Sequence, residues 1–146
     1  MKTYFVTNLV TNKIIPATRE RLKNDIAFWK VKTPMAINKF SIDAYVHLTE
    51  KAASEFLTKF GLEKAKLKLL INKGETLKGQ KCFLMKRHYL VSINMGLKNN
   101  TVRNRDIGIK RGEKMYFHDQ KHFVAVKIKS VKQLEDGKFQ YNFERK

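Results

Sequence analysis

Histidines and arginines occur near expected turns of the chain, and these residue types suit the cleavage of RNA without a metal ion. That reaction needs a group that takes the 2′-hydroxyl proton, an acid that protonates the leaving oxygen, and cations that stabilise the phosphorane. Histidine suits the proton transfers because its pKa lies near neutrality, whereas arginine and lysine supply positive charge. We expect His88 and His118 to transfer protons, and Arg87, Arg103 and Lys121 to hold the phosphate.

A protein that binds nucleic acid without cleaving it would use the same basic residues. Arg105, Lys127 and Lys129 extend the expected nucleic-acid contacts beyond the catalytic candidates. Exposed aromatic side chains beside them can stack on bases. The candidates for stacking, for which a place in the core is the alternative, are Tyr89, Tyr116, Phe117, Tyr141 and Phe143. For each histidine, a solvated surface position is the alternative to catalysis.

Other chemistries find less support in the sequence. No glycine-rich segment precedes Lys-Ser or Lys-Thr, which argues against a phosphate-binding loop. Zinc needs three or four Cys or His ligands, and only His118 and His122 lie close together in the chain. The 13 acidic residues are dispersed, so the sequence lacks the clustered ligands that two magnesium ions require. We therefore expect no metal and no cofactor.

The chain carries a large positive charge. Its 146 residues include 31 basic and 13 acidic residues, which gives a net charge of +18. The densest part is 78–132, where 14 basic residues face three acidic ones, a net charge of +11. Such an excess repels itself in a compact protein and favours a polyanionic partner. We expect nucleic acid, with RNA favoured over DNA; an anionic membrane surface, an acidic protein partner or antitoxin, and a solvated basic face are the alternatives.

The apolar content predicts one folded domain over residues 1–146. At 42% hydrophobic residues, the chain is too apolar for a disordered basic tail. The longest apolar runs have four residues, far fewer than the ~20 that span a bilayer, so we expect no membrane span. Binding to a membrane surface would need a long basic amphipathic helix, and none of the expected helices is clearly one, so we expect no membrane partner. No apolar secretion signal follows Met1, and the single cysteine, Cys82, can form no internal disulfide. These features favour a cytoplasmic protein.

The first half of the chain predicts strands and helices in alternation. Residues 3–10 are rich in β-branched and aromatic residues and residues 40–48 alternate apolar with polar positions, so both predict strands. Apolar residues recur at helical spacing in 18–31, which predicts a helix. Residues 49–74 predict two helices or one bent helix, with Gly61 placed to end the first.

The second half predicts short antiparallel strands separated by Gly, Asn or Asp. The expected strands are 81–86, 88–95, 106–110, 114–118, 122–132 and 138–144. Asp136-Gly137 is the strongest hairpin signal and Asp119-Gln120 a weaker one. Residues 96–105 are polar and basic and predict a long loop. We therefore expect an α+β fold in which amino-terminal helices pack on a carboxy-terminal antiparallel sheet.

This layout, with helices before a small sheet in a short and basic chain, resembles the RelE/barnase-like metal-independent ribonucleases, which include bacterial toxins and phage proteins that cleave RNA. The local likeness covers residues 48–74, which look like the helix, glycine turn and helix that open BrnT-like toxins. That family often has His-Ala and an arginine in its first helix, where this chain has Ala52-Ala53 and Phe56. The resemblance implies a fold and an activity, but no catalytic residue can be carried over from it.

These patterns together predict a nucleic-acid-binding protein that acts as a metal-independent endoribonuclease of the small toxin or phage type. Two alternatives stay open. The first is a protein that binds RNA or DNA without catalysis. The second is a small basic phage or mobile-element protein that inhibits a host machine.

Overall fold

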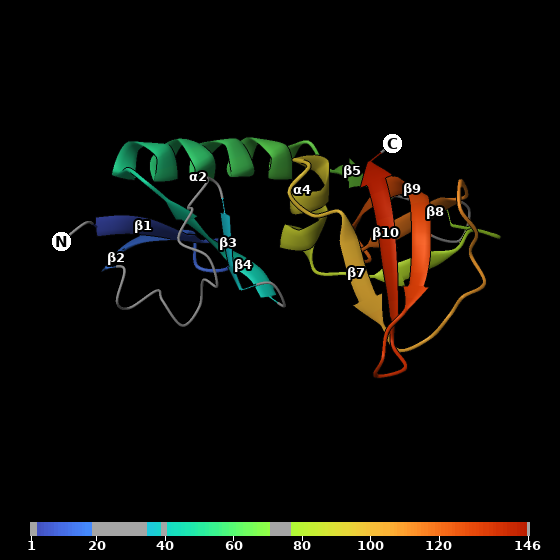
Figure 1. The fold of residues 1–146 in the computed structure, drawn as a ribbon. Coiled ribbons are helices and arrows are strands. Elements are labelled where there is room, and N and C mark those ends of the chain that lie inside the picture. The colour runs from blue at the N-terminus through green and yellow to red at the C-terminus, as the bar shows by residue number, and fades with distance from the viewer. Residues whose placement is uncertain (1–2, 19–34, 39–40, 71–76, 146) are drawn as a thin grey trace. The chain divides into compact units, whose positions relative to one another are not determined.

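A computed structural model of the chain describes residues 3–18, 35–38, 41–70 and 77–145 (Figure 1). These residues form ten strands and two helices. The chain divides into two compact units, residues 1–62 and 63–146, where the sequence predicts one domain. Each unit contains a sheet of its own.

The first unit is built on a four-stranded antiparallel sheet with the strand order β2-β1-β4-β3. Its strands are β1 (Thr3–Asn8), β2 (Lys13–Thr18), β3 (Met35–Asn38) and β4 (Ser41–His47). The β1–β2 hairpin turns at Asn12, whose φ of 59° asparagine tolerates better than most residues. The Asn8 Oδ1 accepts hydrogen bonds from the backbone of Val10 and Thr11 and so fixes this turn.

Helix α2 (Glu50–Ala65) follows β4 and packs against it. It begins where the Thr49 Oγ1 accepts a 3.0 Å hydrogen bond from the Ala52 N–H. Ala53, Phe56 and Phe60 are buried along one face. The Phe56 ring centroid lies 5.2 Å from that of Tyr45 and 4.9 Å from that of His47. Burial of each phenylalanine contributes about 2 kcal/mol to the stability of this unit.

The strands expected at 3–10 and 40–48 are present as β1 and β4. The expected end of a helix at Gly61 is wrong, because α2 continues to Ala65. A glycine can be accommodated within a helix at a cost of about 1 kcal/mol, which the buried face of α2 outweighs. The residues after α2 form a turn and the short strand β5 (Lys68–Leu69) instead of a second helix. The expected helix over 18–31 lies almost wholly outside the described residues.

The second unit contains a six-stranded sheet. Its order is β6-β8-β9-β10-β7, with β5 beside β9. The further strands are β6 (Cys82–Leu84), β7 (Asn100–Arg103), β8 (Lys114–His118), β9 (His122–Gln133) and β10 (Phe139–Arg145). Strands β8, β9 and β10 form the antiparallel meander that the hairpin signals predict, whereas β6 runs parallel to β8.

The sheet curls along its strand order from β6 to β7. Arg103 lies in the edge strand β7, and Leu84 lies in the opposite edge strand β6. The Arg103 Nη2 nevertheless donates a 2.9 Å hydrogen bond to the Leu84 carbonyl oxygen, so the two edges approach each other. The main core is lined by side chains that are at most 1% exposed, including Phe117, Tyr141 and Phe143.

Helix α4 (Arg87–Asn94) packs against β8 and β9. Leu90, Val91 and Ile93 are fully buried. Burial of each side chain stabilises the folded unit by about 2 kcal/mol. Gly96, with a φ of 76°, follows the helix and donates its N–H to the Ile93 carbonyl. Only glycine adopts this conformation without strain, so the chain turns away from the helix at this position.

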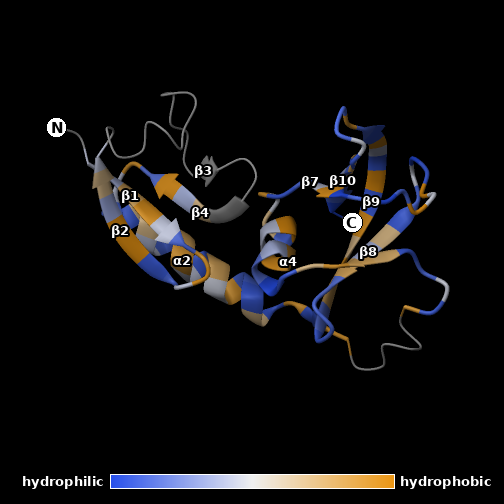
Figure 2. Cartoon of the chain, turned by 90° about the horizontal axis from the view of Figure 1, so that it is seen from below, coloured by the Kyte–Doolittle hydropathy of each residue, from blue (hydrophilic) through white to orange (hydrophobic). Residues whose placement is uncertain are grey.

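The outer surface of the second sheet is partly covered. Leu70, Leu77 and Tyr116 form a small cluster, against which Cys82 and Phe123 pack. Further along β9 the outward positions become exposed lysines, while Val124, Val126 and Ile128 stay buried on the other face. Strand β9 consequently alternates hydrophobic and hydrophilic residues from Val126 to Lys129, after the continuous apolar run of residues 123–126 (Figure 2).

The expected fold class is wrong. The described chain is mainly β structure, and a sheet occupies the first unit where helices were expected. The strand expected at 88–95 is α4, and the loop expected at 96–105 contains β7. A continuous apolar run is compatible with a buried helix or a buried strand, so periodicity alone does not distinguish them. Neither helix in the described ranges is long and apolar enough to cross a bilayer.

Candidate nucleic-acid interface

An ion pair links α4 to the β8–β9 turn. The Arg87 Nε donates a 2.7 Å hydrogen bond to the Asp119 Oδ2. The Asp119 Oδ1 accepts hydrogen bonds from the backbone of Lys121 (2.9 Å) and His122 (2.6 Å). Burial alone would raise the pKa of Asp119, but the hydrogen bonds from Arg87, His122 and Lys121 outweigh it and lower the pKa to about 2. Arg87, an expected phosphate contact, therefore already has an anionic partner.

His118 ends β8 at this same turn. It is 6% exposed, and its Nδ1 accepts a 3.2 Å hydrogen bond from the Gln120 N–H. A nitrogen that accepts carries no proton, so the other ring nitrogen bears the hydrogen of the neutral imidazole. The Nδ1 of His122 is also buried and lies 3.6 Å from the Asp119 Oδ1, beyond hydrogen-bond distance.

His88 and Lys121, also expected at the site, lie on either side of this linkage. His88 is in the first turn of α4, and its ring centroid lies 4.2 Å from that of Tyr89. Lys121 is exposed in the β8–β9 turn. The structure thus brings Arg87, His118 and Lys121 to one turn region. The Arg87 and His118 side chains and the Lys121 backbone N–H make contacts there that stabilise the turn.

Three other cations gather beside β6 and α4. The guanidinium carbons of Arg103 and Arg105 lie 4.9 Å and 5.5 Å from the centroid of the buried Phe83 ring. The Lys98 Nζ lies 5.2 Å from the Tyr89 ring centroid. We refer to Lys98, Arg103 and Arg105 as the cation cluster. Within the described ranges, no carboxylate lies within ion-pair distance of any of the three.

The cation cluster is partly removed from water. Burial, followed by the charge of Arg103, lowers the pKa of Lys98 from 10.5 to about 8. Burial and the charge of Arg105 likewise lower the pKa of Arg103. The Arg103 Nε is buried without a hydrogen-bond partner in the described part of the chain. The repulsion among these like charges destabilises the free protein. A bound anion would offset that repulsion and stabilise the protein.

A second basic surface lies on the outward face of β8 and β9. Lys114 and Lys127 occupy directly opposed positions of the two strands, and both are exposed. Like charges directly opposite each other are unfavourable in a sheet. Lys129 is exposed two residues further along β9, and the Lys114 Nζ lies 4.8 Å from the Tyr116 ring centroid. We refer to Lys114, Lys127 and Lys129 as the lysine face.

The acidic residues of the second unit do little to neutralise these cations. Four of the described carboxylates each accept a backbone N–H within a turn, and they belong to Asp106, Glu113, Asp119 and Asp136. Glu113 and Asp119 additionally pair with Lys81 and Arg87. Each of these carboxylates is committed to a loop. Glu144 on β10 lies directly opposite Lys127 in the sheet, but no ion pair within 4.0 Å joins the two side chains. The cation cluster and the lysine face therefore make no ion pair within the described ranges.

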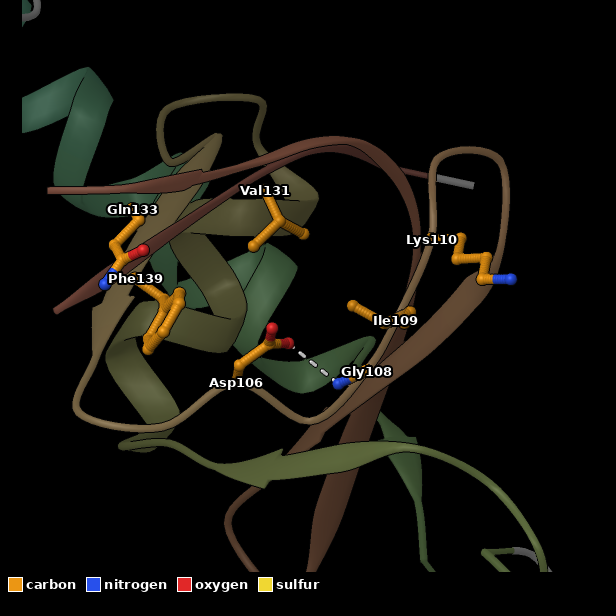
Figure 3. Close-up of a pocket in the computed structure, with 7 residues that line it drawn as sticks. All are labelled: Asp106, Gly108, Ile109, Lys110, Val131, Gln133 and Phe139. Atoms are coloured by element: carbon orange, nitrogen blue, oxygen red, sulfur yellow. Dashed lines mark hydrogen bonds between the residues drawn. The ribbon is translucent and has the colours of Figure 1, made fainter. Parts of the chain in front are cut away.

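A pocket of about 410 Å³ opens beside the loop that follows β7. Figure 3 shows the Phe139 ring, Val131 and the Asp106 carboxylate around it. The Asp106 Oδ1 accepts a 2.8 Å hydrogen bond from the Gly108 N–H, so this carboxylate supports the loop. Since no histidine lines the pocket, it offers one carboxylate and one lysine, Lys110, as its charged groups.

The residues that the structure describes include no group of three or more His, Cys, Asp or Glu side chains that could hold a metal ion. His47, a further histidine of the chain, is 2% exposed, and its Nε2 lies 2.9 Å from the Thr7 Oγ1. Burial lowers the pKa of His47 and keeps the ring neutral near pH 7. This histidine supports the sheet of the first unit.

Comparison of the chain with protein-family models, with curated proteins and with solved structures finds no match.

Arg103, Arg105, Lys127 and Lys129 are expected from the sequence as nucleic-acid contacts, whereas Lys98, Lys114 and Asp119 are not. Lys98 is one of many lysines in the sequence, and its burial depends on the turn after α4. The pairing of Lys114 with Lys127 could be inferred from the Asp119-Gln120 hairpin signal, since strands joined by a short turn pair in register. The role of Asp119 follows from the same signal, because aspartate often binds backbone N–H groups in turns.

Proposed function

We propose that this protein binds nucleic acid through its second unit. Residues 63–146 contain 21 basic and 8 acidic residues, a net charge of +13, against 10 basic and 5 acidic residues in 1–62. The proposal rests above all on the lysine face, where Lys114 and Lys127 stand directly opposite each other. Neither lysine forms an ion pair with a described carboxylate, and this includes Glu144, which lies opposite Lys127 on β10. Phosphates spaced along a strand would relieve this repulsion.

The geometry favours binding over cleavage. Metal-independent cleavage requires a general base that reaches the 2′-hydroxyl and can accept its proton. The acceptor nitrogen of His118 is occupied by the Gln120 N–H, and Arg87 is occupied by Asp119. The cations of the lysine face carry no such commitment among the described residues. Endoribonuclease activity stays a prediction of the sequence, and the binding function does not depend on it.

Binding can be measured by fluorescence anisotropy with single-stranded RNA, single-stranded DNA and duplex DNA of equal length, all with hydroxyl ends. We expect the Lys127→Gln, Lys129→Gln double variant to bind at least ~10-fold more weakly, since each lost phosphate contact costs about 1 kcal/mol. Lys78→Gln is a matched control, because it removes an exposed charge of the same unit from the turn after residue 76.

The proposal is wrong if wild-type protein binds none of the three nucleic acids in low salt. It is also wrong if the double variant and the Lys78→Gln control bind equally well. Comparison of RNA with DNA tests the preference for RNA that the sequence analysis predicts.

A further inference from the structure

We propose that the cation cluster, formed by Lys98, Arg103 and Arg105, receives the terminal phosphate of a nucleic-acid strand. This inference rests on the proposed function and assigns to it a particular part of the nucleic acid. The observation behind it is the convergence of the three cations around Phe83 and Tyr89, without a described carboxylate to neutralise them.

Arg103 is held in place before any ligand arrives. Its Nη2 donates to the Leu84 carbonyl oxygen at 2.9 Å, and its guanidinium carbon lies 4.9 Å from the Phe83 ring centroid. Phe83 is itself 5% exposed and contacts Tyr141, with ring centroids 5.2 Å apart. A guanidinium fixed by an aromatic ring and a carbonyl loses little entropy when it binds an anion.

The hydrogen bonds of Arg103 are incomplete. Its buried Nε has no partner in the described ranges, although a buried donor without an acceptor costs about 1 to 3 kcal/mol. An oxygen of a phosphate group can accept from the guanidinium edge, and such charge-assisted bonds are among the strongest in proteins. Arg103 is therefore not fully hydrogen-bonded by the described residues of the free protein, which favours the binding of an anion by its guanidinium group.

The charge of the cluster decides which phosphate fits best. A phosphodiester within a strand carries one negative charge, whereas a terminal phosphate monoester carries about −1.5 to −2 near pH 7. The lysine face, with three exposed lysines on two neighbouring strands, suits the successive phosphodiesters of a strand. Two arginines over the Phe83 ring, with a partly buried lysine over Tyr89 that feels the charge of Arg103, instead match the higher charge and three oxygens of a terminal phosphate.

The test uses the full chain and one single-stranded 12-residue oligonucleotide with an internal fluorophore, prepared with a 5′-phosphate, a 3′-phosphate or hydroxyls at both ends. We expect one phosphorylated form to bind about 10-fold tighter than the hydroxyl form, as one extra charge-assisted contact implies. The two phosphorylated forms show which end of the strand is received.

Arg105→Gln is the informative variant, because Arg105 is exposed and its side chain makes no described hydrogen bond. We expect this variant to bind the phosphorylated and hydroxyl forms with equal affinity, and Arg105→Lys to restore part of the preference. The control Lys78→Gln should keep the full preference. Circular dichroism of each variant verifies the fold.

Equal binding of all three oligonucleotides by the wild-type protein would overturn this inference and leave the proposed function intact. If both Arg105→Gln and Lys98→Gln keep the full preference for the phosphorylated oligonucleotide, the terminal phosphate binds elsewhere. That result would also overturn the inference. Failure of every oligonucleotide to bind would overturn both proposals.

Discussion

The Arg87 Nε lies 2.7 Å from the Asp119 Oδ2, which joins the first turn of α4 to the turn between β8 and β9. The Met85 N–H donates to the His118 carbonyl oxygen at 2.8 Å beside it, so backbone and side chains tie the same two segments together. This linkage explains why residues with the chemistry of a nuclease site cluster in the structure without forming an open site.

The Asp119→Asn variant tests that linkage. Asparagine keeps an oxygen for the turn but loses the charge that Arg87 contacts, so we expect a loss of about 1 to 2 kcal/mol of stability at pH 7. The pKa of Asp119 is lowered from 3.8 to about 2, so its contribution is present above pH ~4 and is lost as the pH falls toward 2. Amide hydrogen exchange in peptides from 114–133 measures this difference.

Arg87→Gln provides the matched control for Asp119→Asn. Since the two side chains form one pair, the double variant should lose less than the sum of the single losses. If the stability losses of the two single variants simply add in the double variant, the two side chains do not stabilise each other. A stability difference between the wild type and Asp119→Asn that is as large at pH 2.5 as at pH 7 would also contradict a stabilising ion pair.

A second prediction concerns the loop that carries Arg105. The Tyr141 hydroxyl donates to the Arg105 carbonyl oxygen at 2.7 Å and accepts from the Ile107 N–H at 3.1 Å. Tyr141→Phe removes both bonds and leaves the ring, so we expect a loss of about 1 to 2 kcal/mol and faster hydrogen exchange at Ile107. Unchanged protection of Ile107 would show that the hydroxyl does not hold the loop.

Much of the second sheet could be predicted from the sequence because its signals are local. Asp136-Gly137 and Asp119-Gln120 mark tight turns, and β9 alternates lysines with aliphatic residues, so the β8–β9–β10 meander follows from period and turn chemistry. The assignment of α4 failed because residues 90–93 are all buried, and such a run fits two secondary structures equally well.

The candidate site depends on contacts that sequence spacing does not contain. Arg103 meets Leu84 and Phe83 only because the sheet curls and brings its first and last strands together. Lys98 is desolvated because the turn after α4 places it against Tyr89. Histidines at turns, by contrast, were conspicuous in the sequence, yet burial and hydrogen bonding at His118 oppose the role that its position suggested.

The affinity for a phosphorylated oligonucleotide should fall as the pH rises from 7 to 9. The pKa of Lys98 is about 8 in the free protein, with Arg103 on β7, Arg105 beyond it and Tyr89 on α4 around it. Lys98 is therefore mainly charged at pH 7 and mainly neutral at pH 9, and we expect about 10-fold weaker binding at the higher pH.

Lys98→Arg supplies the control for this pH dependence, because arginine stays charged over the whole range. The variant should bind nearly equally at pH 7 and pH 9. If its affinity falls as steeply as that of the wild type, another group causes the effect.

RNA integrity separates a binding protein from a ribonuclease. We expect total RNA incubated with the wild-type protein in EDTA to stay intact, because the acceptor nitrogen of His118 is occupied and Arg87 is paired. Gel electrophoresis beside the His88→Ala and His118→Ala variants provides the comparison. Cleavage by the wild type that either variant abolishes would establish the endoribonuclease activity that the sequence predicts.

The salt dependence of nucleic-acid affinity tests the central claim most directly. If about six phosphates are neutralised, log affinity for a single strand falls with log salt concentration at a slope near −4, and the Lys127→Gln, Lys129→Gln variant should have a slope shallower by about 1. Lys78→Gln should keep the wild-type slope. An affinity that is independent of salt, or equal slopes for the wild type and the double variant, would contradict binding through the lysine face.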